Sequence, residues 1–491
     1  MLKYRPVIWS YKKVCRVLNL KQDLVPGLTG ELFYDIQSQA EFCSKGSLFL
    51  PHEDNINEVL EVSRAFRNGA TAAIISIDPG YFHSKAPVIQ VSCLKEALVK
   101  LASAARETFT GAMIAVTGST GKTTTKDMLH HALSHLGPCH ATYLNRNVGL
   151  DVALAVAQVS SSTDFSVIEV GSGWPNSIAE KNVYVKPGIA IITNVGYSHS
   201  EYFSGIQDIL KEKLSLFDSL TDKRVAILNR SVYDLDRENL NLIKTKNIDR
   251  LITVGNKTDD AIRLIDLKQQ PTKISARVSI DKEIYSYSIK YPTPAFAWNA
   301  LFSMAAGYAL DLDLEIIADS INTFSGLDRR LERLRVDASG SGKIIELIHD
   351  AYNASPDSVR ALLCILKQRE KAKRRVMIFG DMLEMGDVSS KLHEDLVGDI
   401  ASSGIDLLIT VGQYTKVVAV LLSSDVETYS FPDADLARAK IMDLIDHGDL
   451  VAVKGSNGMS LDKIVKRLTG KGMYRTPAFP DWTIEGEVDQ D

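Results

Sequence analysis

The chain has 491 residues, of which 45% are hydrophobic and 24% charged, and its formal net charge at pH 7 is −5. That length suggests about three domains, and the nearly balanced charge gives no electrostatic reason to bind nucleic acid or an anionic membrane. The N-terminus lacks a signal-peptide pattern, no apolar run has membrane-spanning length, and five scattered cysteines form no Cys-x-x-Cys pair. We therefore expect a cytoplasmic monomer with reduced thiols.

The first 107 residues predict a small N-terminal α/β domain. Short apolar strands are expected at 46–50, 72–76 and 88–91, and helical periodicity spans 57–68. We interpret residues 1–107 as the first domain, 108–328 as the central domain and 329–475 as a Rossmann-like C-terminal domain. An acidic tail follows at 476–491. The fold class is α/β in three domains.

A phosphate-binding loop opens the central domain. The apolar strand 112–116 precedes it, and apolar spacing from Met128 to Leu136 predicts the helix that follows. Glycines let backbone N–H groups point at phosphate oxygens, Lys122 supplies a cation for the terminal phosphates, and the hydroxyl of Thr123 is a candidate Mg²⁺ ligand. The predicted ATP contacts in this loop are Gly118, Ser119, Thr120, Gly121, Lys122, Thr123 and Thr124.

Two polar residues follow later strands of a predicted parallel, doubly wound sheet, whose strands are expected at 165–170, 189–193 and 225–228. Glu169 ends the first of them, where it is either an Mg²⁺ ligand or a solvated strand-end acid. His199 follows the second and either binds metal or phosphate or is a structural loop histidine.

Lys213 falls on the apolar stripe of a helix expected over 206–217, whereas Lys211 falls on its polar face. A lysine that points inward is costly unless it is paired, neutral or modified. One interpretation is that its stem passes the edge of the core and its amine reaches water. The other is a neutral amine, which CO₂ can carbamylate into a metal-binding carboxylate.

Loops after other elements carry further candidate ligand contacts. Asn145 and Asn147 lie in the loop after the P-loop helix, where they either contact substrate or make turns. The C-terminal domain is expected to hold strands at 343–348, 376–379, 407–411 and 450–453. The polar residues that follow them, with no evident structural role, are Asp350, Tyr352, Asn353 and Lys454.

Four motifs together resemble the Mur ligase family over nearly all of residues 108–470. The motifs are Thr117-Gly-Ser-Thr-Gly-Lys-Thr-Thr-Thr125, Asp350-Ala-Tyr-Asn-Ala-Ser-Pro-Asp-Ser358, Gly380-Asp-Met-Leu-Glu-Met-Gly386 and Val453-Lys-Gly-Ser456. The resemblance implies an ADP-producing, amide-forming ligase that activates a carboxylate with ATP and Mg²⁺ through an acyl phosphate. The last three motifs favour addition of D-Ala-D-Ala to a UDP-MurNAc-peptide in peptidoglycan synthesis.

The resemblance implies that residues 1–107 bind a UDP-sugar-type acceptor substrate and that residues 108–328 bind ATP. It also implies roles for individual residues. It makes Lys122, His199 and Lys213 catalytic, with Lys213 carbamylated, and it implies metal-associated positions at Thr123, Glu169, His199 and Lys213. It adds an adenine contact at Asn299 and phosphate and ribose contacts at Arg330 and Asp350. The remaining substrate contacts are Asn145, Asn147, Tyr352, Asn353 and Lys454.

Three alternatives stay open at this point. Gln39-Ala-Glu41 stands where the family carries Asp-Ser-Arg, so a relative that joins a different acid and amine is the first alternative. The second is a non-catalytic nucleotide-binding subunit, which retention of Lys122, Glu169 and Lys213 disfavours. The third is a P-loop motor or switch, which would turn over nucleotide without an amide product.

Overall fold

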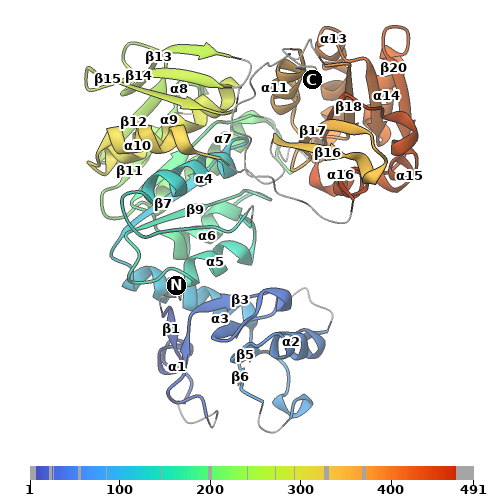
Figure 1. Cartoon of the computed structure of the whole chain (residues 1–491). Coiled ribbons are helices and arrows are strands. Elements are labelled where there is room, and N and C mark those ends of the chain that lie inside the picture. Colours follow the sequence, from blue (N-terminus) through green and yellow to red (C-terminus); the bar gives the residue numbers. More distant parts are fainter. Residues whose placement is uncertain are drawn as a thin grey trace, which may run out of the picture. The chain divides into compact units, whose positions relative to one another are not determined.

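The computed structural model describes residues 7–470 apart from 22–24, 26, 53–56, 84–85, 145, 197–201, 240, 271–272, 292, 326–330 and 368–371 (Figure 1). The described residues divide into two compact units. The first comprises residues within 7–196, 205–263 and 300–317, and the second residues within 202–204, 264–299 and 318–470. The α/β class is confirmed, and the three-domain boundaries stay a prediction.

The N-terminal part of the first unit is built on a four-stranded parallel sheet in the order β3-β4-β5-β6. Its elements are β1 (Trp9–Ser10), α1 (Tyr11–Leu18), β2 (Leu32–Phe33), β3 (Asp35–Gln37), η1 (Ala40–Phe42), β4 (Ser47–Phe49), α2 (Glu58–Arg67), β5 (Ala72–Ile75), η2 (Pro79–Tyr81), β6 (Val88–Gln90) and α3 (Leu94–Thr108). The strands and the helix predicted from the sequence here are confirmed.

A nine-stranded sheet has the order β15-β14-β13-β12-β11-β10-β7-β9-β8, and its strands from β12 to β8 are parallel and belong to the first unit. The elements of this parallel part are β7 (Ala112–Thr117), α4 (Lys122–Leu133), β8 (Cys139–Ala141), α5 (Leu150–Ala157), β9 (Phe165–Glu169), α6 (Ser177–Val185), β10 (Ile189–Ile192), α7 (Ile206–Leu214), η3 (Ser215–Ser219), β11 (Val225–Asn229), α8 (Arg230–Asn239), η4 (Ile243–Thr245) and β12 (Arg250–Gly255). Because β7 lies between β9 and β10, the loops after these three strands meet at one edge.

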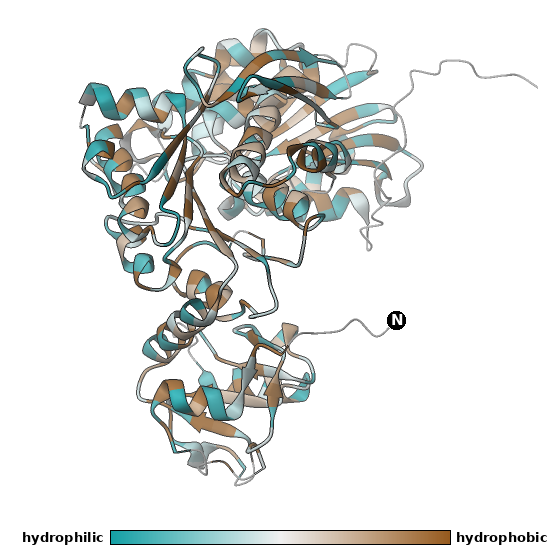
Figure 2. Ribbon diagram, turned by 90° about the vertical axis from the view of Figure 1, so that its left-hand side faces the viewer, coloured by the Kyte–Doolittle hydropathy of each residue, from teal (hydrophilic) through white to brown (hydrophobic). Residues whose placement is uncertain are grey.

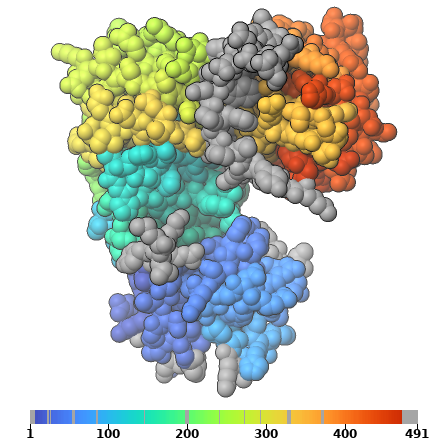
Figure 3. All heavy atoms as spheres, viewed as in Figure 1, coloured from blue at the N-terminus to red at the C-terminus, as the bar shows by residue number. Residues whose placement is uncertain are grey.

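Hydrophobic strands form the core of this sheet, as the brown ribbons of Figure 2 illustrate. Every residue of β9 and β10 is buried, the pattern of parallel strands covered by helices on both faces. The N-terminal part packs on this sheet's helices through α3, which contacts α5 and α6. The indole N–H of Trp9 donates to the carbonyl of Ala157 at 2.8 Å, and the blue and teal surfaces are contiguous in Figure 3.

The elements that follow β12 in the chain contribute to both units, and their three strands belong to the same nine-stranded sheet. They are β13 (Ile262–Gln269), β14 (Ile274–Ile280), β15 (Glu283–Ile289), α9 (Pro294–Ala309) and α10 (Leu314–Thr323). β14 and β15 pair antiparallel, a hairpin that the sequence analysis did not predict. None of the helices in the described part of the chain has the length and apolarity needed to cross a membrane, and the five cysteines form no disulfide among the described residues.

The second unit contains a six-stranded sheet in the order β16-β17-β21-β18-β19-β20, parallel except for β16. Its elements are β16 (Glu332–Asp337), η5 (Ala338–Gly340), β17 (Ile344–Asp350), α11 (Pro356–Lys367), β18 (Arg374–Gly380), η6 (Gly386–Val388), α12 (Ser389–Glu394), α13 (Val397–Ala401), β19 (Leu407–Val411), α14 (Gln413–Leu422), β20 (Glu427–Phe431), α15 (Ala434–Leu444), β21 (Asp449–Lys454), η7 (Asn457–Met459) and α16 (Asp462–Thr469). The Rossmann-like prediction is confirmed.

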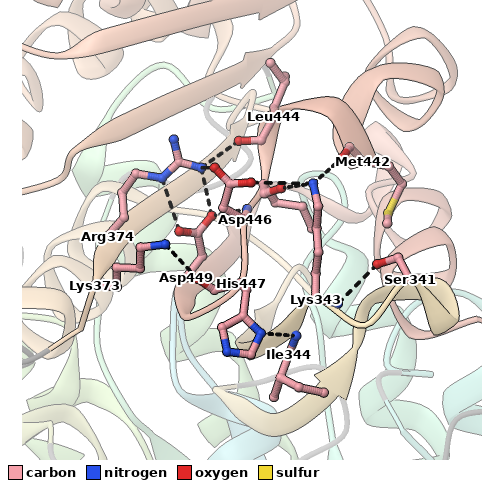
Figure 4. Close-up of polar contacts among 11 residues, drawn as sticks. Ser341, Lys343, Ile344, Lys373, Arg374, Met442, Leu444, Asp446, His447 and Asp449 are labelled. Carbon is pink, nitrogen blue, oxygen red and sulfur yellow. Dashed lines mark hydrogen bonds and ion pairs between the residues drawn. The ribbon is translucent and has the colours of Figure 1, made fainter.

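An ion-pair network closes the turn between α15 and β21 (Figure 4). The guanidinium of Arg374 binds the carboxylate of Asp449 through Nε and Nη2, at 3.1 and 2.8 Å, and Asp449 is 1% exposed. Lys343 Nζ donates to the carbonyl of Ile445 at 2.7 Å. These contacts lie at the amino ends of the parallel strands, opposite the edge where the polar loops gather.

Candidate active site

The P-loop adopts a backbone that only glycine accommodates at two positions. Gly118 has φ +151°, and a Cβ there would lie 2.0 Å from Oγ1 of Thr193. Gly121 has φ +79° and immediately precedes the first residue of α4, Lys122. The loop therefore delivers the chain from a buried strand to a helix N-terminus, where backbone N–H groups and the helix dipole favour an anion.

Lys122 lies across this loop. Its Nζ donates to the carbonyl of Gly118 at 2.8 Å and to that of Ser119 at 3.3 Å. The cation is thus held among the backbone groups that the sequence analysis assigned to phosphate binding. Its ATP-binding role stays a prediction.

The loop after β10 braces the P-loop, which the sequence analysis did not predict. The side chain of Asn194 accepts from the backbone N–H of Thr120 at 2.7 Å and donates to Thr120 Oγ1 at 2.6 Å. Ser119 Oγ donates to the carbonyl of Gly196 at 2.7 Å, and Thr193 Oγ1 donates to the carbonyl of Thr120 at 2.6 Å. One feature of the sequence could have indicated this contact: residues 193–196 follow β10, which is the neighbour of β7 in the sheet.

Glu169 is completely buried, so the solvated-acid alternative is wrong. Its Oε1 accepts from Thr123 Oγ1 at 3.0 Å and from Asn147 Nδ2 at 2.6 Å. Its Oε2 has no hydrogen-bond partner among the described residues. A buried carboxylate oxygen without a partner is costly, and carboxylate and hydroxyl oxygens are the ligands that Mg²⁺ prefers. The residues present therefore fit a magnesium ion.

The described residues contain no group of three His, Cys, Asp or Glu side chains that could hold a metal ion. A magnesium site here consequently depends on the Thr123 hydroxyl and on additional oxygen ligands beside Glu169.

Lys213 points into the protein, as predicted from its position on the apolar stripe. It is 1% exposed, and its Nζ donates to Ser172 Oγ at 3.2 Å. Burial, and then the nearby charge of Lys122, lower the pKa of Lys213 to about 7. The alternative in which the amine reaches water is wrong, whereas carbamylation stays a prediction.

A second buried lysine, Lys126, orders the loop that carries Asn147. Its Nζ donates to the carbonyls of Thr142 and Leu144 at 2.7 and 2.8 Å, and Lys126 is 1% exposed. Thr142 Oγ1 in turn accepts from the backbone N–H of Glu169 at 3.0 Å. Lys126 thereby fixes the segment that packs against the metal-binding candidate, and the sequence analysis missed it.

The structure brings one group of predicted residues together in the first unit, at the carboxyl edge of the sheet that contains β7. The members of this group are Lys122, Thr123, Asn147, Glu169 and Lys213. Three predicted site residues, Asn145, His199 and Arg330, lie outside the described residues.

Asp350 and Lys454 form an ion pair in the second unit, at the carboxyl ends of β17 and β21. Lys454 Nζ lies 2.8 Å from Asp350 Oδ2 and donates to the carbonyl of Asn353 at 2.8 Å. Lys454 is 1% exposed and Tyr352 is 9% exposed. These predicted residues therefore lie close together, and the ammonium group of Lys454 binds the loop that carries Asp350, Tyr352 and Asn353. Asn299 lies in α9. Their ligand contacts stay predictions.

The Gly380-Asp-Met motif has a structural explanation. The buried carboxylate of Asp381 accepts from the backbone N–H groups of Gln413, Tyr414 and Thr415 at 2.8–3.2 Å, and so caps α14. Gly412 has φ +122°, and a Cβ there would collide with Asp381.

Two family models match the chain. The Mur ligase middle domain matches residues 116–307, and the Mur ligase, glutamate ligase domain matches residues 329–457. A UDP-N-acetylmuramoyl-tripeptide–D-alanyl-D-alanine ligase of Rickettsia prowazekii is 31% identical over 436 residues, which cover 88% of this chain and 94% of that protein. The chain belongs to the Mur ligase family. Members of this family are ATP-dependent ligases that form amide bonds.

Other Mur ligases are similar along most of their length. The Bacillus subtilis ligase of the same name is 28% identical and covers 83% of this chain and 86% of that protein. A crystal structure of MurF from Acinetobacter baumannii superposes with a TM-score of 0.77 at 23% identity, covering 94% and 98% of the two chains. MurF of Thermotoga maritima in complex with ADP gives 0.71 at 19% identity, covering 89% and 97%. These structures establish the Mur ligase fold.

Proposed function

We propose that this protein joins D-alanyl-D-alanine to UDP-N-acetylmuramoyl-tripeptide with ATP and Mg²⁺, in the cytoplasm and as a monomer. The observation that carries the ATP chemistry is the buried Glu169, whose unpaired Oε2 lies in the site that Thr123 and the P-loop build. The printed names of similar ligases from Rickettsia prowazekii and Bacillus subtilis support this pair of substrates.

The chemistry begins when the acceptor carboxylate attacks the γ-phosphorus of ATP. The P–O bond to ADP breaks, and an acyl phosphate forms. The amine of the second substrate then attacks the acyl carbon, and the tetrahedral intermediate expels inorganic phosphate and loses a proton to give the amide. Lys122 and the N–H groups at the start of α4 stabilise charge on the phosphates. Exclusion of water protects the acyl phosphate from hydrolysis.

Glu169 and Thr123 would hold Mg²⁺, which when bound supplies positive charge to the phosphate oxygens. Lys213 contributes through its amine, whose pKa burial lowers to about 7, so that the neutral form is accessible near neutral pH. Attack of that amine on CO₂, with loss of a proton to water, gives a carbamate, which would offer an oxygen ligand to the same metal, and His199 would be a further ligand.

The remaining predicted residues complete the proposed binding sites. Asn299, Arg330 and Asp350 bind the nucleotide. The acceptor and the incoming amine are bound by Asn145, Asn147, Tyr352, Asn353 and Lys454. Support for this assignment comes from the position of Asp350 and Lys454 on the edge of their sheet where glycine-bearing loops gather.

A second candidate function is ligation of a different acid and amine. Gln39 stands where the family carries the first residue of Asp-Ser-Arg, and its Oε1 accepts from Arg146 Nη2, in the loop that also carries Asn147. This hydrogen bond joins the N-terminal part to a loop of the central sheet. It is made by Gln39, which differs from the family's residue at a position where the family recognises the acceptor substrate.

Substrate-dependent ADP release tests the proposal. We expect ADP, phosphate and the amide product in equal amounts only when UDP-N-acetylmuramoyl-tripeptide and D-alanyl-D-alanine are both present. Lys122→Ala should lower kcat by about 10²–10³-fold, since it removes a cation from the phosphates. Mass spectrometry of the product identifies the amide.

Two outcomes separate the candidates. ADP release without an amide from this pair, but with an amide from another acid and amine, establishes the second candidate function. Full activity of Lys122→Ala contradicts the ATP chemistry itself.

A further inference from the structure

Glu212 is a buried carboxylate that directly precedes Lys213 in α7 and has no part in the chemistry above. It is 6% exposed. Its Oε2 accepts from the backbone N–H of Asn176 at 2.7 Å, and its Oε1 accepts from the N–H of Ile178 at 2.8 Å and from Ser177 Oγ at 3.2 Å. All three donors belong to the N-terminal end of α6.

α6 lacks a cap of its own. Its N-cap residue, Asn176, has φ +68° and makes no side-chain capping hydrogen bond. The first N–H groups of a helix need acceptors, and the positive end of the helix dipole favours a carboxylate. Glu212 meets both requirements from a different helix, so it ties α7 to the start of α6.

The loop that leads into α6 also receives the amine of Lys213. Lys213 Nζ donates to Ser172 Oγ at 3.2 Å. Ser177 Oγ, which donates to Glu212, accepts from the N–H of Gly173 at 3.2 Å. Two consecutive residues of α7 thus bind the segment 171–177. Glu212 binds its end, and Lys213 binds Ser172 near its beginning.

A third contact holds the beginning of the same segment. Lys181, 2% exposed, donates from Nζ to the carbonyls of Gly171 and Ser177 at 3.1 and 2.8 Å. Lys181 belongs to α6, so both ends of residues 171–177 are fixed to that helix. The position of Ser172 relative to α7 therefore depends on the hydrogen bonds between Glu212 and α6.

We propose that Glu212 is a positioning residue for Lys213: by capping α6 from α7, it holds Ser172 where it orients the lysine amine for reaction with CO₂. In that reaction the neutral amine forms an N–C bond to CO₂, one C=O electron pair moves to oxygen, and an amine proton passes to water, which gives a carbamate anion. The inference rests on the proposed function for the use of this carbamate, and on the geometry of α6 and α7 for the role of Glu212.

The test compares two buried capping carboxylates of the first unit in the full-length protein. Asp236 is 1% exposed and accepts from the N–H groups of Leu242 and Ile243 at 2.8 and 3.1 Å, outside the segment 171–177. Asp236→Asn is therefore the matched control for Glu212→Gln, since both exchange a buried cap for its amide.

Burial lowers the pKa of Lys213, whereas the charge of Glu212 raises it. The readout is therefore the carbamate signal of Lys213 in ¹³C NMR, titrated with ¹³C-labelled CO₂ at a fixed pH well above that pKa, where the amine is neutral in every variant. We expect Glu212→Gln to raise the CO₂ concentration for half-carbamylation by about tenfold, and Asp236→Asn to leave it unchanged. The kcat of Glu212→Gln should fall in ambient CO₂ and recover at high bicarbonate, with the KM for ATP unchanged. A merely structural cap predicts equal, unrescued losses in both variants.

Each result has one meaning. Equal CO₂ titrations for the wild-type protein and Glu212→Gln, or the absence of a wild-type carbamate, overturn the positioning role. A wild-type protein that takes up CO₂ and shows the Glu212 effect, but does not ligate the two named substrates, supports the positioning role and contradicts the proposed function instead.

Discussion

One carboxylate oxygen shows how the candidate site is organised at the scale of single residues. Glu169 Oε2 is buried without a partner, although Oε1 of the same group accepts two hydrogen bonds. Leaving such an atom unpaired costs about 1–3 kcal/mol, more for a charged group. A cation would offset that cost, so the unpaired oxygen supports the magnesium site of the proposed function.

The lowered pKa of Lys213 leads to a pH-dependent modification. A lysine whose pKa is about 7 loses its proton as the pH rises from 6 to 8. At a fixed concentration of dissolved CO₂, we therefore expect the carbamate signal in ¹³C NMR to increase severalfold over that interval. An ordinary lysine would remain protonated throughout it.

Lys213→Arg is the control for this experiment, because arginine keeps the positive charge and cannot form the carbamate. The signal must be absent from that variant. A wild-type signal of the same size at pH 6 and pH 8 would contradict the pKa.

The sequence predicted individual residues where a periodic pattern or a motif defined their surroundings. Lys213 is an example, because its place on an apolar stripe already indicated burial. Lys126, Asn194 and Glu212 were missed, because each acts on backbone groups that lie far away in the sequence. A capping carboxylate supplied by another helix leaves no local pattern.

At the scale of elements, buried parallel strands were predictable and exposed or paired edges were not. β10 is a continuous apolar run, β9 is mostly apolar, and both were found. β8 has three half-buried residues and no apolar run. β14 alternates buried Ile274, Ala276, Val278 and Ile280 with more exposed residues. This alternation is typical of a strand, but it contains no apolar run and was not predicted.

A buried histidine connects three elements of the second unit. His349, 2% exposed and in β17, has Nε2 at 3.2 Å from Asp462 of α16 and Nδ1 at 3.6 Å from Glu332 of β16. Burial lowers the pKa of His349, but the hydrogen bond to Asp462 and the charges of Asp462 and Glu332 outweigh burial, and the pKa is raised. The ring thus joins α16 to the sheet.

The raised pKa of His349 predicts a pH-dependent stability. A histidine whose pKa is higher in the folded state stabilises that state fully below its ordinary pKa, and this contribution is lost as the pH rises through the folded pKa. We expect the free energy of unfolding of the second unit to fall above neutral pH, measured by urea denaturation. His349→Gln should lower it by about 1–3 kcal/mol at pH 6 and flatten the decline. An unchanged pH profile in that variant would assign the decline to other groups.

At the scale of the whole molecule, each compact unit has hydrophobic clusters of its own among the described residues. The first contains a large cluster that runs from Trp9 to Ile243 and a smaller one around Phe49, and the second contains a cluster from Leu334 to Leu468. Distinct clusters favour separate unfolding transitions, which depart from two-state behaviour. The sequence predicted the order of the α/β segments, but the boundaries between units depend on contacts that no local pattern reports.

A substitution in the network of Figure 4 tests whether the two units unfold separately. Asp449→Asn removes the charge that binds Arg374 in a buried site and should destabilise the second unit by about 2–3 kcal/mol. Differential scanning calorimetry should show one transition moved to lower temperature and the other unchanged. A single transition that moves as a whole would show that the units unfold together.

In the proposed function, the contacts of Lys122 make nucleotide binding an exchange of partners. Its ammonium group donates to the carbonyls of Gly118 and Ser119. A phosphate that binds this ammonium group would replace those carbonyls, so the net gain would be the difference in free energy between two hydrogen-bonded positions of one charge. The same two hydrogen bonds stabilise the conformation of the loop without nucleotide, so one side chain would serve both the structure of the loop and its ligand.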